Sequence, residues 1–134
     1  MKLAITTFVL LALSGSALAA GQKSATLTIR HQMKGCHSWS LDGKSWSASQ
    51  KLTLTQGGSL AVVNNDVMPH TLVQVSGPQA TLTRAAMKRI GAHAVARFAT
   101  RGRYVFTTRA GEDYMKGMKT VGEDNVLRLV VTVA

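Results

Sequence analysis

The stretch AVVNNDVMPHTLVQVS, residues 61–76, is the part of the chain that indicates the fold most directly. Its two apolar runs are typical of the end of one buried strand and the start of the next. The NND run at residues 64–66 favours a tight turn, because Asn and Asp side chains hydrogen-bond their own backbone. Pro69 fixes its own φ and biases Met68 toward extended backbone, so His70 follows a stiffened corner. A histidine held there is either a ligand or general base, or an ordinary surface residue.

Short alternating apolar segments separated by turns continue on both sides of this corner. They predict strands at residues 25–30, 59–63, 70–75, 94–99, 104–107 and 126–133. The one helix-like segment is TRAAMKRI, residues 83–90, with Gly91 in the position of a C-terminal cap. Strands at this spacing favour an all-β sandwich with one short helix. Trp39 and Trp46 are both expected in its core.

The chain opens with a segment typical of a secretory signal peptide. Lys2 precedes the apolar stretch 3–13, and the ALA run at residues 17–19 matches a small-x-small cleavage site. We therefore expect a signal peptide over residues 1–19, a single domain over residues 20–134, and a periplasmic or secreted protein. A buried N-terminal helix is the alternative interpretation. No later apolar run is long enough to cross a bilayer.

The net charge of +10 comes from 16 Lys and Arg residues against 6 Asp and Glu residues. Such a field favours anionic partners, namely an acidic protein, lipid head groups or nucleic acid. The basic residues are scattered and aromatic residues are few, so the chain offers no evident stacking platform for nucleic acid. Export also argues against nucleic acid. We expect membrane contact to be peripheral at most, and a solvated basic face is the simplest interpretation.

The only cysteine, Cys36, lies in the run HQMKGCHSWS at residues 31–40. In an exported chain a lone cysteine makes no intrachain disulfide, so Cys36 is a spare thiol, an intermolecular link or a metal ligand. Adjacent residues on extended backbone point to opposite faces, which argues against a catalytic dyad of Cys36 and His37. The chain also carries no paired-carboxylate, serine-triad or phosphate-loop motif, and we expect no enzyme. His31 ends a strand and is expected on the surface.

Two segments resemble the copper-ligand segments of cupredoxins of the plastocyanin and azurin type. AVVNNDVMPHTLVQV, residues 61–75, is similar to the first, in which a paired-Asn turn and Pro-His precede a strand. GRYVFTTRAGEDYMKGM, residues 102–118, resembles the second, where the family has Gly-x-Tyr-x-Phe-x-Cys followed by a histidine and a methionine. The resemblance implies a Greek-key sandwich of cupredoxin type, a copper cofactor, and a role in electron transfer or copper handling.

The second segment departs from the family pattern. Thr108 stands where the family cysteine should be, and the second histidine position falls on Gly111 or Asp113, depending on the family spacing. A hydroxyl is a poor substitute for a thiolate on copper. The resemblance places the loop 31–39 and the start of a later strand at the same end as the first histidine. It therefore implies a non-standard copper site drawn from His70, Cys36, His37, His93 and Met118. The alternative is a metal-free binding module that uses its basic surface on an acidic partner or membrane.

Overall fold

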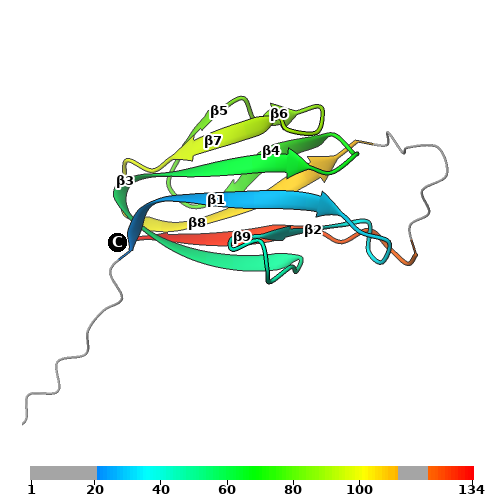
Figure 1. The fold of residues 1–134 in the computed structure, drawn as a ribbon. Helices are drawn as coiled ribbons and strands as arrows, with labels where there is room; N and C mark the ends of the chain where they lie inside the picture. The colour runs from blue at the N-terminus through cyan, green and yellow to red at the C-terminus, as the bar shows by residue number, and fades with distance from the viewer. Residues whose placement is uncertain (1–20, 112–120) are drawn as a thin grey trace, which may run out of the picture.

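The computed structural model describes residues 21–111 and 121–134. Within these ranges all regular elements are β-strands (Figure 1). The strands are β1 (Gln22–His31), β2 (His37–Ser40), β3 (Ser49–Asn65), β4 (His70–Ser76), β5 (Thr81–Thr83), β6 (Ala86–Met87), β7 (His93–Arg97), β8 (Gly102–Ala110) and β9 (Arg128–Val133). The all-β prediction is confirmed. The described residues contain no helix with the length and apolar character needed to span a membrane.

Strand β3 joins two layers of strands. Its first part pairs with β9 from Ser49↔Arg128 to Leu54↔Val133, whereas residues 59–65 pair with β1. Between these parts Gly57 adopts a φ of 80°, and Figure 1 shows β3 bending from one layer into the other. One layer thus contains β2, β1, β3, β7 and β5, and the other contains β3, β9, β8, β4 and β6. Large apolar side chains fill the core, including Phe98, whose ring lies edge-on to those of Tyr104 and Phe106.

The predicted helix at residues 83–90 is wrong. Arg84 has a φ of 53°, in the left-handed region that a right-handed helix does not contain. The following strand β6 pairs with β4 through His70↔Met87, and the Ala85 carbonyl accepts a hydrogen bond from the Leu72 N–H at 2.9 Å. Pairing with β4 therefore outweighs the weak local helix propensity of this segment.

The two tryptophans occupy different environments. Trp39 is fully buried and its Nε1–H donates to the Ala48 carbonyl at 3.0 Å, which confirms the core prediction for this residue. Trp46 is half-buried, and the guanidinium carbon of Arg30 lies 4.1 Å from the centre of its ring. The core prediction for Trp46 is wrong, because its ring stacks beneath an arginine at the surface instead of entering the space between the layers.

Asp42 organises the turn that follows β2. Its Oδ1 accepts hydrogen bonds from the backbone N–H groups of Ser45 and Lys44, at 2.7 and 2.8 Å, and from the Ser40 hydroxyl at 2.9 Å. These donors favour the charged carboxylate, and the N–H of Ser45 contributes most to lowering the pKa of Asp42 to about 2.

The Ser40→Ala substitution removes one of these donors, and we expect the pKa of Asp42 to rise toward its ordinary value. An NMR titration of the Asp42 carboxyl carbon in both proteins measures this. Because the folded-state pKa is depressed, the contribution of Asp42 to stability is present at neutral pH. It is lost as the pH falls below about 4. An unchanged titration midpoint in Ser40→Ala would contradict the assignment.

Candidate metal centre

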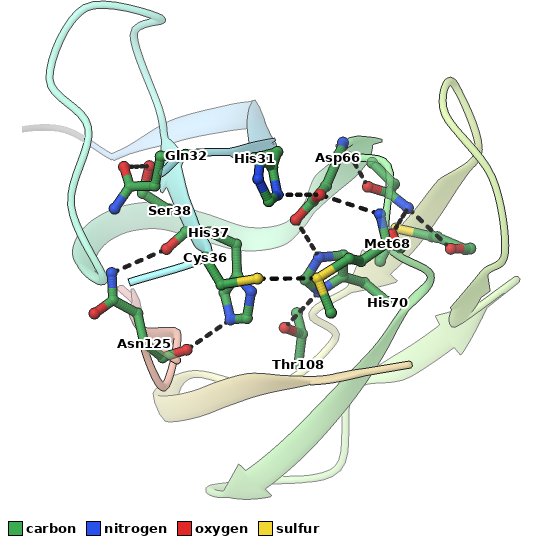
Figure 2. Close-up of polar contacts among 12 residues, drawn as sticks. His31, Gln32, Cys36, His37, Ser38, Asp66, Met68, His70, Thr108 and Asn125 are labelled. Carbon is green, nitrogen blue, oxygen red and sulfur yellow. Dashed lines mark hydrogen bonds and ion pairs between the residues drawn. The ribbon is translucent and has the colours of Figure 1, made fainter. Parts of the chain in front are cut away.

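Four segments that are distant in sequence meet at one end of the sandwich (Figure 2). They are the loop between β1 and β2, the corner between β3 and β4, the end of β8, and the segment just before β9. The residues that they bring together are His31, Cys36, His37, Asp66, Met68, His70, Thr108 and Asn125. The structure thus places Cys36 and His37 beside the corner that carries His70.

The corner between β3 and β4 is held by its own side chains. Asn64 Oδ1 accepts from the Asp66 N–H at 2.8 Å, and its Nδ2 donates to the Met68 carbonyl at 2.9 Å. Asp66 Oδ1 in turn accepts from the Met68 N–H at 3.1 Å. This is the self-bonded turn that the NND run predicts. It brings Asp66 and His70 together, four residues apart.

A buried carboxylate lies at the centre of the cluster. The Asp66 side chain is fully buried, and its Oδ2 lies 2.9 Å from His70 Nε2. Burial raises the pKa of Asp66, but hydrogen bonds from His70 and the Met68 N–H outweigh it and leave the pKa below its ordinary value. His31 Nδ1 lies 3.4 Å from Oδ1, within ion-pair range but without hydrogen-bond geometry. The surface prediction for His31 is wrong, because this ring is largely buried and faces Asp66.

His70 is oriented from both sides of its ring. Because a carboxylate only accepts hydrogen bonds, Nε2 carries the proton that is donated to Asp66. The remaining nitrogen, Nδ1, lies 3.0 Å from the hydroxyl of Thr108, which donates to it in the neutral ring. Thr108, the residue that stands where the resemblance places the family cysteine, is thus in contact with His70.

His37 presents a nitrogen lone pair inside the cluster. Its Nε2 donates to the backbone carbonyl of Asn125 at 2.6 Å, and its buried Nδ1 has no hydrogen-bond partner among the described residues. Burial, helped by the nearby charge of His70, lowers the pKa of His37, although the Asn125 carbonyl and Asp66 oppose it. A neutral imidazole that donates one N–H to a carbonyl is the usual form of a metal-ligating histidine.

The donor atoms of the cluster suit copper. His37, Asp66 and His70 each offer one ligand atom, and these atoms lie within 4.8 Å of one another. The rings of His37 and His70 meet edge to face, with their centres 5.0 Å apart. Imidazole binds both copper and zinc, and sulfur ligands shift the preference toward copper. Nδ1 of His37, which is buried and has no hydrogen-bond partner within residues 21–111 and 121–134, is the observation that makes this cluster fit a metal ion.

Of the other predicted ligands, His93 is not part of this cluster. His93, at the start of β7, is exposed and its Nε2 accepts from Arg84 Nη2 at 3.2 Å. Met118 lies outside the described residues. Asp66, Met68 and Asn125 were not predicted as site residues. The spacing of Asp66 and His70 within one tight corner is a local signal that points to the first, whereas Asn125 lies 88 positions from His37 and carries no local signal.

No protein family and no curated protein matches the chain, whereas solved structures match its fold. A mutant of amicyanin in its reduced Cu(I) form is 16% identical over 89% of this chain and 88% of that chain, with a TM-score of 0.43. A multicopper oxidase is 14% identical over 82% of this chain and 41% of that chain, with a TM-score of 0.48. A copper-containing nitrite reductase from Thermus scotoductus is 16% identical over 92% of this chain and 25% of that chain, with a TM-score of 0.43.

All three TM-scores lie below 0.5, so the likeness to these structures is a distant one. At such identities the likeness concerns the fold alone. The ligands of the site are therefore assigned from the contacts within this chain, not from those of its neighbours.

Proposed function

We propose that this chain is an exported, non-enzymatic copper-binding protein with a non-standard site, acting in electron transfer or copper handling. The observation that carries the proposal is the buried Nδ1 of His37, which has no partner in the part of the chain that the structure describes and lies in a cluster with His70 and Asp66. Export is supported by the signal-peptide pattern of residues 1–19.

The residues that would hold the ion are His37, His70 and Cys36. Asp66 keeps the proton of His70 on Nε2, which leaves the lone pair of that ring on Nδ1. The Asn125 carbonyl likewise keeps the proton of His37 on Nε2 and leaves its lone pair on Nδ1. Copper supplies one-electron redox chemistry in such a site, or is itself the cargo. Both rings are almost fully buried, so the chain excludes bulk water from the nitrogen donors.

The surface charge supports an acidic partner protein for this copper site. The chain has a net charge of +10, and Arg84, Arg89 and His93 line an open hollow outside the cluster. Complementary charge mainly accelerates association and is weakened by salt. Any exchange of copper or electrons with such a partner is therefore expected to slow as the ionic strength rises.

Copper titration of the purified protein tests the proposal, with Cu(I) supplied by a chromophoric chelator in competition. We expect His37→Ala to weaken copper binding at least about tenfold, the lower end of the loss seen even for groups that merely support a ligand. His93→Ala is the matched control, because this histidine is exposed and outside the cluster. The copper affinity of this variant should equal that of the wild type. With Cu(II), an intense visible thiolate-to-copper band that vanishes in Cys36→Ser would identify that ligand.

A wild-type protein that binds copper no more tightly than His37→Ala overturns the proposal. The alternative is then a metal-free module that binds an acidic partner or membrane through its basic surface. Its signature is partner capture that falls with salt and is unaffected by chelators or by Cys36→Ser.

A further inference from the structure

Two sulfur atoms meet beside the nitrogen and oxygen donors. Cys36 Sγ lies 3.0 Å from Met68 Sδ, and both side chains are buried (Figure 2). They come from different segments, the loop after β1 and the corner before β4. The close approach of a thiol and a thioether at the edge of a metal-binding cluster defines a second, softer set of donors, which we name the sulfur pair.

The Cys36 side of the sulfur pair is held in an uncommon backbone conformation. Cys36 has a φ of 64°, which residues with a side chain rarely adopt unless their surroundings hold them there. Asn125 supplies that support. Its N–H donates to the Gly35 carbonyl at 2.8 Å and its Nδ2 to the His37 carbonyl at 3.0 Å. A Cβ on Gly35 would collide with the Asn125 side-chain amide, so the loop fits closely around this side chain.

The left-handed turn at Cys36 explains why two neighbouring residues serve one cluster. On extended backbone the side chains of Cys36 and His37 would point to opposite faces. With Cys36 in the left-handed region, its sulfur reaches Met68 while the His37 ring reaches that of His70 (Figure 2). Neighbouring side chains diverge on extended backbone, as the sequence predicted for Cys36 and His37, but Cys36 is not extended.

The Met68 side of the sulfur pair is equally constrained. The Met68 N–H donates to the Asp66 carboxylate, and the Met68 carbonyl accepts from the Asn64 side-chain amide. The next residue is the rigid Pro69. Both sulfur atoms are thus positioned by hydrogen bonds that exist without a metal. Such preorganisation lowers the entropy that binding must overcome.

We propose that the sulfur pair of Cys36 and Met68 gives the site its selectivity, so that it takes copper as monovalent Cu(I). Thiolate and thioether donors select this soft ion, whereas the imidazoles and Asp66 alone also suit divalent ions. On binding, the Cys36 Sγ–H bond breaks, an Sγ–Cu bond forms, and the proton passes to solvent with no change of oxidation state. The inference rests on the proposed function and adds the oxidation state of its metal.

Binding of Ag(I), a monovalent probe that does not change oxidation state, is compared with binding of Zn(II) by calorimetry. The Met68→Leu substitution removes the thioether but keeps the side-chain volume. We expect it to weaken Ag(I) binding at least about tenfold and to change Zn(II) binding by less than about twofold. Met87→Leu is the matched control, because Met87 is a buried core methionine outside the sulfur pair. It should change neither affinity.

X-ray absorption of the Cu(I)-loaded protein gives a second measurement. Two sulfur scatterers are expected for the wild type and one for both Met68→Leu and Cys36→Ser. Equal losses of Ag(I) and Zn(II) affinity in Met68→Leu, or no loss of either, would overturn the selectivity proposal. If copper binding is lost in His37→Ala but unaffected in Met68→Leu, the selectivity proposal fails and the proposed function stands. If neither substitution weakens copper binding, both the selectivity proposal and the proposed function fail.

Discussion

The His70→Ala substitution is expected to destabilise the folded protein by about 3 kcal/mol, because it takes a hydrogen-bond donor away from a buried carboxylate. Asp66 is fully buried, and His70 Nε2–H donates a hydrogen bond to its Oδ2 at 2.9 Å. The Met68 N–H still donates to Asp66 and His31 lies nearby, so the carboxylate keeps part of its stabilisation in the variant. Urea denaturation at pH 7 measures the loss. The same substitution removes an imidazole donor, so copper binding should weaken at least as much as in His37→Ala.

The pH dependence of this loss identifies its cause. In the wild type the pKa of Asp66 is lowered, so its contribution to stability is present above the unfolded-state pKa of about 4. It is lost as the pH falls through the folded-state pKa. Burial raises the pKa of Asp66 and the hydrogen bond from His70 lowers it, so the pKa of Asp66 is expected to rise when His70 is removed. The stability deficit of His70→Ala should therefore shrink as the pH is lowered from 7 toward 4.

Two outcomes would contradict this interpretation of the His70–Asp66 pair. One is a deficit that stays constant between pH 7 and pH 4. The other is a similar loss in His93→Ala, which replaces an exposed histidine and should change stability by less than about 0.5 kcal/mol.

Trp39→Ala is expected to cost about 3–5 kcal/mol of folding free energy, the range for removing a large buried aromatic side chain. Trp39 is fully buried and pairs with Ile29 across β1 and β2. Its Nε1–H donates to the Ala48 carbonyl, which loses this donor in the variant. Because β2 begins at His37, loosening this strand should also weaken copper binding.

Trp46→Ala is the matched comparison for Trp39→Ala. Its half-buried ring contributes mainly a surface cation–π contact with Arg30, worth about 0.5–1 kcal/mol. Chemical denaturation of the two variants should therefore separate them by at least about 2 kcal/mol. Equal losses would mean that Trp39 does not anchor β2 as the structure indicates.

Local patterns predicted most of the strands because each depends on neighbours in sequence. The alternation in residues 126–133 corresponds to β9 (Arg128–Val133), and the alternation after Pro69 corresponds to β4 (His70–Ser76). The segment 83–90 misled for the same reason. Its spacing suits a short helix, and only the presence of β4 alongside makes a strand the better solution.

The sequence by itself determined the all-β architecture, the self-bonded corner at residues 64–66, and the placement of His70 directly after it. The resemblance to cupredoxins, rather than a local pattern, implied that Cys36 and His37 lie near that corner. The architecture and the corner itself follow from strand periodicity, proline stiffness and the short reach of Asn and Asp side chains, all of which act within a few residues.

Only the tertiary structure decided which atoms face the cluster. Asp66 accepts a hydrogen bond from His70 inside the folded core, and Met68 meets Cys36 because Cys36 adopts a left-handed φ. Asn125, 88 positions away, orients His37 through a hydrogen bond that no local pattern encodes. Strand pairing leaves His93 exposed on β7. The direction of a side chain depends on pairing register and long-range hydrogen bonds, and these exist only once the chain has folded.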